Sequence, residues 1–317
     1  MFKSILRLAG SLAIVVVCSG AANAQSIGAF AAETQGLGTG TEMRPALAVF
    51  NGMLYAAWKG VPGDNKLWWS RFDGTKWSQE QPMVTAFSGN GPALAVFGNA
   101  LYAAWKGVAG DPRMWWSKFD GSTWSREQLG VGTGSTDGPS LAVFNNALYA
   151  AWKGPNGNQM LWSKFDGTKW SSEQQGVGTG TSARPALAVY NNTLYAVWKG
   201  VPNDTRLWWS KFDGTSKWLP EQMLQGNTSD APSAAAFNGY LFVAWKGVPG
   251  DTKMWWSAFN GSWTPQVAGV GVGTSTGPSL VAYNNHLAAA WKGVPNDTRM
   301  FWSQFNAAHL VSPVGLK

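Results

Sequence analysis

Cysteine and histidine are almost absent from this sequence, with one and two copies among 317 residues. The single Cys18 lies in the N-terminal leader described below, so neither disulfides nor thiol chemistry is expected in the mature chain. His286 and His309 are too few and too isolated for a zinc site or a Ser-His-Asp arrangement. No phosphate-binding or dinucleotide-binding motif occurs either. We therefore expect no cofactor and no metal.

Charge is also scarce. Only 13% of the residues are Asp, Glu, Lys or Arg, and the net charge is +7. The basic residues are spread evenly along the chain rather than gathered into one stripe, which argues against a nucleic-acid partner. No apolar run beyond the leader is long enough to span a membrane.

The first 24 residues have the parts of a secretory signal. Lys3 and Arg7 precede an apolar run over residues 8–17, and the small-residue sequence Ala22-Asn23-Ala24 follows. We expect residues 1–24 to be a cleaved signal peptide and residues 25–317 to form a single domain. The protein is thus expected to be secreted or periplasmic.

Tryptophan and glycine, by contrast, are abundant, with 21 and 39 copies. The phrase Leu54-Tyr55-Ala56-Ala57-Trp58-Lys59-Gly60 returns with small changes five more times, at spacings of 46 or 47 residues. A fixed period of this length indicates a solenoid, a propeller or an array. The phrase is centred on Trp58, Trp105, Trp152, Trp198, Trp245 and Trp291.

Each repeat contains four short runs separated by turn residues. In the first repeat the pairs Asn51-Gly52 and Asp73-Gly74 supply the positive φ values that tight hairpins need. Residues 54–58 are apolar on both faces, as in a sheet covered from both sides. The pattern predicts an all-β fold, a six-bladed β-propeller of four-stranded antiparallel blades, with Trp58 and its equivalents in the core.

The ends of the chain indicate how the ring closes. Residues 30–41 match residues 170–181 without a gap, so the mature N-terminus begins on an outer strand. We predict that residues 28–35 complete the sixth blade. The tail after Leu310 is the alternative occupant of that position.

Two families share these patterns. Ser70-Arg71-Phe72-Asp73-Gly74-Thr75-Lys76-Trp77 resembles the Asp-box (BNR) repeat of sialidase-like propellers, although its Asp stands one position late. The whole mature chain also looks like six-bladed propeller lectins of the fungal fucose-binding type and related bacterial propeller lectins. That resemblance implies carbohydrate binding in pockets between blades, lined by Trp and a few polar groups.

The candidate ligand loop follows the second run of each repeat, where loops on a rigid scaffold usually carry function. It contains a lysine, an aspartate and a pair of aromatic residues, whose alternative role is inter-blade core. The third repeat lacks the aspartate, which predicts five good pockets and one poor one. The candidate sugar-binding residues are Lys59, Asp64, Trp68, Trp69, Lys106, Asp111, Trp115, Trp116, Lys199, Asp204, Trp208, Trp209, Lys246, Asp251, Trp255, Trp256, Asp297 and Trp302.

Two arginines break the repeat. Arg44 and Arg184 occupy a position where the other repeats have Gly or Ala, and they belong to blades that face each other across the ring. We expect them near the mouth of the central channel, as a possible anion site. A glycosidase of the Asp-box type would need a third arginine and a non-repeating Tyr nucleophile, which the sequence does not supply.

The predicted function is an exported, multivalent carbohydrate-binding protein without catalysis, whose partners are soluble glycans or cell-surface carbohydrate. Two alternatives stay open: a degenerate sialidase-like glycosidase, and a propeller that serves as a protein-interaction platform.

Overall fold

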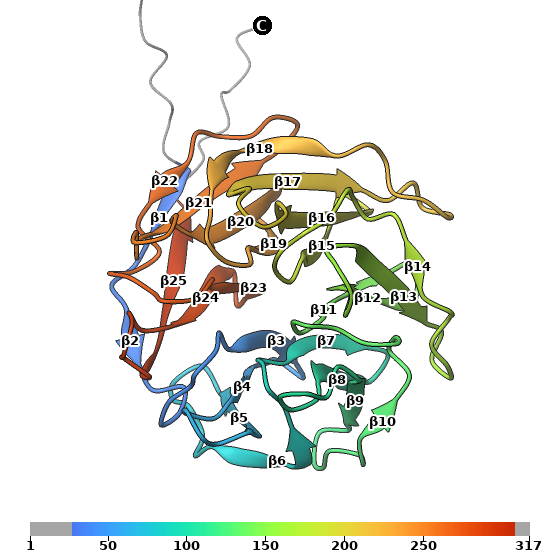
Figure 1. Ribbon diagram of the computed structural model, residues 1–317. Helices are drawn as coiled ribbons and strands as arrows, with labels where there is room; N and C mark the ends of the chain where they lie inside the picture. The colour runs from blue at the N-terminus through green and yellow to red at the C-terminus, as the bar shows by residue number, and fades with distance from the viewer. Residues whose placement is uncertain (1–26, 308–317) are drawn as a thin grey trace, which may run out of the picture.

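The computed structural model describes residues 27–307. The expected signal peptide and the tail after Leu310 lie outside this range. Six antiparallel sheets stand around a central axis (Figure 1), and residues 27–307 contain no helix that could span a membrane. The strands of the first three blades are β3 (Ala46–Phe50), β4 (Met53–Lys59), β5 (Lys66–Phe72), β6 (Gln81–Phe87), β7 (Ala93–Phe97), β8 (Ala100–Lys106), β9 (Met114–Phe119), β10 (Gln128–Leu129), β11 (Ser140–Phe144), β12 (Ala147–Lys153), β13 (Met160–Phe165) and β14 (Gln174–Gln175).

The second half of the ring repeats this order, so the predicted six-bladed propeller is confirmed. Its strands are β15 (Ala186–Tyr190), β16 (Thr193–Lys199), β17 (Arg206–Lys211), β18 (Gln222–Asn227), β19 (Ser233–Phe237), β20 (Tyr240–Lys246), β21 (Met254–Phe259), β22 (Val267–Ala268), β23 (Ser279–Tyr283), β24 (His286–Lys292) and β25 (Met300–Ala307).

The N-terminal segment closes the ring, as the sequence predicts. Strand β1 (Gly28–Phe30) pairs antiparallel with β25, and so does β2 (Thr34–Gln35). The Phe30 ring meets the Phe305 ring edge to face, with centroids 5.2 Å apart. The two ends of the described chain therefore share the sixth blade, where Figure 1 shows blue and red strands side by side.

Aromatic rings fill the space between neighbouring blades. Tyr55 stacks on Trp69 within blade 1, and Trp69 packs against Phe119 of blade 2 with centroids 5.1 Å apart. The same trio recurs around much of the ring, for example at Tyr102 and Trp116. Apolar residues on both faces of each blade thus serve to join blades, which explains the lack of polar alternation in the sequence.

The two hairpin turns of a blade are built differently. Asn51 and Gly52 both have positive φ and form the two-residue loop between β3 and β4. Asp73 instead begins a longer loop and acts through its carboxylate, whose Oδ1 accepts hydrogen bonds from Thr75 N, Thr75 Oγ1 and Lys76 N at 2.7–2.9 Å. These bonds, led by the Thr75 hydroxyl, lower the pKa of Asp73 to about 2.

This turn predicts an acid-sensitive stability. Asp120, Asp166 and Asp213 hold equivalent turns, and hydrogen bonds lower the pKa of each to about 2. The pKa of an Asp side chain in the unfolded chain is about 3.9. The carboxylates therefore stabilise the fold above that pH, and their contribution is lost as the pH falls through about 2. Urea unfolding from pH 5 to pH 2 should show this decline, and it should be shallower in a variant with all four residues changed to Asn.

The fifth blade supplies the control for that experiment. Asn260 begins the corresponding turn, which is one residue shorter and lacks this carboxylate, and its N–H bonds Ser262 O. An equal pH slope in the wild type and the four-site Asn variant would contradict the prediction.

Candidate functional site

The loop between β4 and β5 is organised by Asp64. Its backbone N–H bonds Val61 O at 2.9 Å, and its carboxylate accepts from Lys66 N at 3.0 Å and from Trp68 Nε1 at 2.7 Å. Gly60 must be small here, because a Cβ would lie 2.3 Å from Asp64 Oδ2. The carboxylate therefore fixes both the loop and the orientation of the indole.

The structure separates the two members of each aromatic pair. Trp68 is half-buried at the loop, whereas Trp69 is 6% exposed and belongs to the inter-blade core. A ligand in solution can reach the first Trp but not the second, because blade packing covers both faces of the latter. The half-buried members are Trp68, Trp115, Trp208 and Trp255, and the buried ones are Trp69, Trp116, Trp209 and Trp256.

Blade 6 differs from this scheme. Phe301 takes the place of the first Trp and is buried. Trp302, the candidate named from the sequence, is half-buried and packs on Phe72 of blade 1 with centroids 4.9 Å apart. Asp297 is present and pairs with Arg299 at 2.8 Å. Blade 6 thus keeps the carboxylate but not the indole.

A basic residue completes the site, and sequence reasoning missed it. Arg206 donates from Nε and Nη2 to the two carboxylate oxygens of Asp204 at 2.8 and 3.1 Å, and its guanidinium lies 4.9 Å from the Trp208 ring centroid. These contacts, led by the Arg206 hydrogen bonds, lower the pKa of Asp204 to about 2. The signal was the spacing Asp-x-Lys/Arg. Its cations are Lys66, Arg113, Arg206, Lys253 and Arg299.

The repeated lysine supports the loop from within. Lys199 Nζ donates to Ser182 Oγ at 2.7 Å and to Asp204 O at 3.0 Å, and burial lowers its pKa. Lys59 is 2% exposed and bonds Asp64 O in the same way. Lys246 makes the equivalent bonds, while Lys106 is half-buried and donates to two loop carbonyls. These ammonium groups position the loop.

The loop of blade 3 has neither the aspartate nor the half-buried tryptophan. Leu161 replaces the indole, and Gln159 fills the space beside Gly154, with Cγ 3.1 Å from where a Cβ of Gly154 would lie. The loop thus offers no carboxylate and no exposed aromatic face.

A cavity of about 160 Å³ opens beside blade 2. Asp111 and Trp115 of the loop line it, together with Glu127 of the outer strand region and Thr85 and Phe87 at the end of β6 of blade 1. Its remaining lining residues are Trp105, Gly107 and Val108. This cavity brings an aromatic surface and two carboxylates together.

The linker explains why the cavity lies there. In blade 1 the linker residue Gly38 lies against the core Trp58, since a Cβ would come within 2.2 Å of its Cζ2, and Thr39 N donates to Glu80 at 2.9 Å. Equivalent glycines pack on the core Trp in blades 3, 4 and 6, at Gly132, Gly178 and Gly271.

Blade 2 lacks this glycine. Thr85 stands there with φ 69°, a backbone conformation that β-branched residues rarely adopt, and its hydroxyl bonds Glu127. Phe87, two residues on, is 50% exposed. The space between Trp105 and Glu127 is therefore open in blade 2. In other blades a glycine packs against the core Trp and fills the corresponding space.

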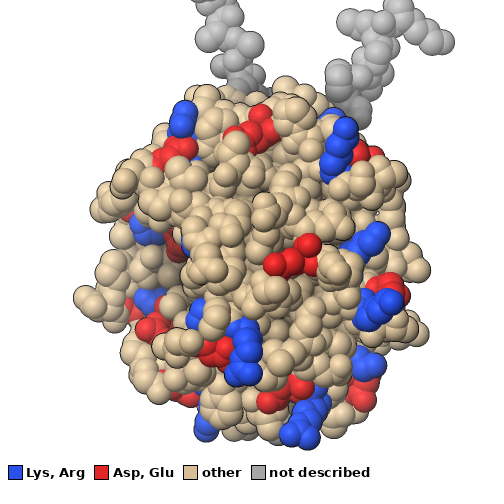
Figure 2. All heavy atoms as spheres, turned by 45° about the vertical axis from the view of Figure 1, so that its right-hand side comes forward, with Lys and Arg blue, Asp and Glu red and all other residues tan. Residues whose placement is uncertain are grey.

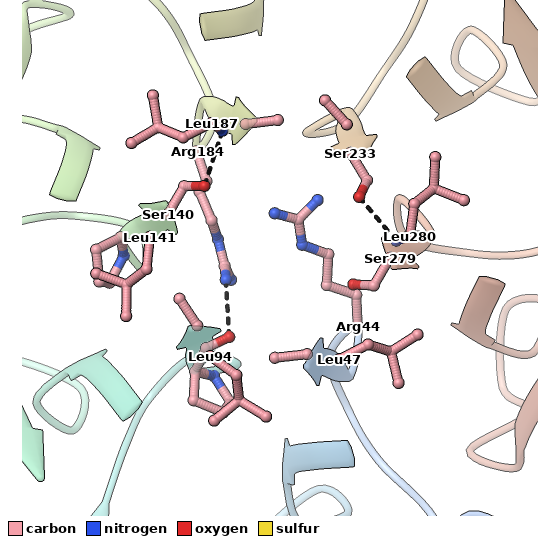
Figure 3. Close-up of a pocket in the computed structure, with 16 residues that line it drawn as sticks. Arg44, Leu47, Leu94, Ser140, Leu141, Arg184, Leu187, Ser233, Ser279 and Leu280 are labelled. Atoms are coloured by element: carbon pink, nitrogen blue, oxygen red, sulfur yellow. Dashed lines mark hydrogen bonds between the residues drawn. The ribbon is translucent and has the colours of Figure 1, made fainter. Parts of the chain in front are cut away.

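The two non-repeating arginines lie in the central channel. Arg44 donates from Nη1 to Pro232 O at 2.8 Å, and Arg184 donates from Nη1 to Pro92 O at 3.1 Å. Both line a cavity of about 90 Å³, which they enter from opposite walls (Figure 3). Each thus reaches across the channel to a blade other than its own.

Charges on the outer surface are dispersed. Figure 2 shows acidic and basic side chains in small adjacent groups among neutral residues, without a continuous patch of one sign on that face.

No family model matches the sequence, and no curated protein is significantly similar to it. Solved structures are similar in fold. A protein of unknown function from Dyadobacter fermentans has a TM-score of 0.67 and 11% identity, with 89% of this chain and all of that one covered. The lectin of Aleuria aurantia, a six-bladed propeller that recognises fucose, has a TM-score of 0.62 and 13% identity over 89% of this chain and all of the lectin. The NanB sialidase of Streptococcus pneumoniae has a TM-score of 0.60 and 9% identity, covering 85% of this chain and 70% of the sialidase. At these identities the comparisons establish the propeller fold.

Proposed function

We propose that the protein is an exported, multivalent carbohydrate-binding protein whose ligands bind at the loops between blades. The observation that supports this most strongly is the repeated pair of a half-buried indole and a carboxylate, held rigid at 2.7–3.2 Å in blades 1, 4 and 5. Export rests on the N-terminal sequence, and the fold similarity to a fucose-recognising lectin agrees with the proposal.

The cavity beside blade 2 is the best-formed pocket for a sugar. Trp115 and Phe87 offer apolar surface for the C–H face of a pyranose, and Glu127, Asp111 and Thr85 offer oxygen atoms to its hydroxyls. Arg113 lies 5.1 Å from the Trp115 ring centroid but does not line the cavity, so a sugar need not displace it. The other loops with the Asp–Trp pair offer the same chemistry.

The centre of the ring suits hydrolysis of a glycoside poorly. Its larger cavity, of about 370 Å³, is lined only by Leu, Ala and Val residues, whose side chains supply no acid, base or nucleophile. The repeated tyrosines cannot act as nucleophiles, because Tyr55 and its equivalents are stacked in the inter-blade core. We therefore favour binding over catalysis.

A binding experiment tests the proposal. A glycan array on the mature protein should show sugar binding, and calorimetry with the best ligand should give more than one equivalent per chain. Trp115→Ala should weaken binding in the blade 2 pocket at least tenfold, because stacking on an indole is lost. Trp208→Ala, the same change in blade 4, is the matched control and should leave the blade 2 pocket unaffected.

The alternatives give different results. No binding across a broad panel would reject the lectin function and leave a protein-interaction platform. Turnover of a fluorogenic sialoside that is lost in Arg44→Ala would instead establish a glycosidase. Several weak sites per chain would explain why the loop is repeated. When a chain binds through several sites at once, its overall affinity can exceed that of a single site by roughly 10²–10⁴.

A further inference from the structure

The central channel concentrates positive charge. The guanidinium groups of Arg44 and Arg184 lie in one cavity, and Arg184 is only 4% exposed. Burial, followed by repulsion from Arg184, lowers the pKa of Arg44 to about 9. Arg44 is therefore cationic at neutral pH, and it is half-buried.

The hydrogen-bond partners of the two guanidinium groups are neutral. Arg44 donates to the carbonyl oxygens of Ala231 and Pro232, and Arg184 donates to Pro92 O and to the amide oxygen of Asn90. Neutral acceptors satisfy donors but do not compensate charge. Buried charges in proteins are normally paired with an opposite charge.

Nearby carboxylates compensate only in part. Asp137 Oδ1 is 3.7 Å from Arg184 Nε, but its oxygens accept hydrogen bonds from Asn90 Nδ2 and from the backbone of Gly138 and Arg184. Asp230 accepts from the backbone of Ala231 and Gly277. Neither aspartate accepts a hydrogen bond from a guanidinium within residues 27–307.

Several donors in the cavity have no acceptor. Arg44 donates only through Nη1 to described residues, and Arg184 Nε faces Asp137 Oδ1 at 3.7 Å without a hydrogen bond to it. The hydroxyls of Ser140 and Ser233 line the same cavity, and each accepts a backbone N–H from the next blade. Neither hydroxyl donates to any described residue, so its hydrogen is available. Figure 3 shows these groups around one space.

Neighbouring glycines make room for this arrangement. A Cβ on Gly138 would lie 3.0 Å from Arg184 Cζ, and one on Gly277 would lie 3.6 Å from Arg44 Nη1. Glycine at position 138 thus leaves room for the Arg184 guanidinium.

We propose that the channel binds one small monovalent anion, of the size of chloride or formate, between the guanidinium groups of Arg44 and Arg184, with the Ser140 and Ser233 hydroxyls as further donors. The polar end of the channel, of about 90 Å³, accommodates an anion of this size, and it adjoins an apolar cavity of about 370 Å³. The bound anion links blades 1 and 4 across the ring and stabilises the folded state, because it binds there and not to the unfolded chain. This site is separate from the loops proposed to bind sugar.

Thermal unfolding with chloride as the probe tests the proposal. Chloride should replace gluconate at constant ionic strength, so that general screening stays equal. The wild type should show a saturable rise of a few degrees in melting temperature, and formate should act similarly. Arg44→Gln should abolish the chloride-specific rise. Arg126→Gln, the same change at an exposed arginine on the outside of blade 2, should retain it.

A second measurement on the wild type avoids reliance on the variant. The ³⁵Cl NMR line should broaden on addition of the protein and narrow again when bromide or formate displaces chloride. Equal melting temperatures in chloride and gluconate, an unbroadened line, or a chloride-specific rise that persists in Arg44→Gln would each overturn the proposal.

Discussion

Trp58→Ala should lower the free energy of unfolding by about 3–5 kcal/mol, because the change removes a fully buried indole from a central strand. Trp58 has no exposed surface. The backbone at Gly38 already lies against the edge of its ring, and the neighbouring strand pairs with it at Trp68. Rigid backbone on two sides limits collapse into the space left behind, which places the loss toward the upper end of that range. Chemical denaturation measures it.

Trp68→Ala is the matched control. Trp68 lies directly opposite Trp58 on the next strand, but it is half-buried and its Nε1 faces the Asp64 carboxylate. The same truncation should therefore cost less than half as much stability. If the proposed sugar sites are correct, it should weaken ligand binding, whereas Trp58→Ala should act mainly through folding. Equal losses of stability in the two variants would contradict this assignment of the two tryptophans.

The difference between Trp58 and Trp68 shows which structural features the sequence predicts and which it does not. The 46- or 47-residue period and the Asn-Gly turn at Asn51 specify strand order and blade number, because both depend on local chain geometry. The burial of Trp58 follows from its place on a central strand. Which member of the pair Trp68-Trp69 is exposed does not follow, because both faces of a blade are covered and alternation alone cannot distinguish them.

The open pocket beside blade 2 depends on a comparison between repeats. The Asp111 loop looks like four of the other loops, so a prediction from the loop carboxylates expects five good pockets and one poor one beside blade 3. The difference lies near the end of β6, where Thr85 replaces the glycine that packs against the core Trp in other blades. That departure is visible in the sequence, but its effect is not, because it depends on how closely a linker approaches the next blade.

The channel arginines show a similar limit. Their shared repeat position places Arg44 and Arg184 on opposite sides of a six-bladed ring. The acceptors at Pro232 and Pro92 belong to blades far away in the chain. Only the closed ring brings these carbonyls within reach, so the sequence predicts where the cations lie but not what they contact.

Ring closure itself gives the last large effect. Deletion of residues 27–35 should lower the melting temperature by about 10 °C or more. We expect the free energy of unfolding to fall by more than about 3–5 kcal/mol, and each kcal/mol lowers the melting temperature of a domain of this size by roughly 2–4 °C. The deletion removes β1 and β2 and exposes the Phe305 ring, now 1% exposed, that Phe30 covers. It also removes the bond from Ser303 Oγ to Ala31 O at 2.6 Å and leaves β25 as an unpaired edge.

Deletion of residues 308–317 is the control, because β1 and β2 already occupy the outer position of the sixth blade. That variant should keep the melting temperature of the full-length mature chain. A stable, cooperative domain after removal of residues 27–35, together with destabilisation by the C-terminal deletion, would mean that the tail closes the ring instead. Opening of the ring should also separate blade 6 from blade 1, where Trp302 packs on Phe72 and Trp77. The N-terminal deletion should therefore increase proteolysis at both blades before it affects blade 3, which the closing strands do not touch.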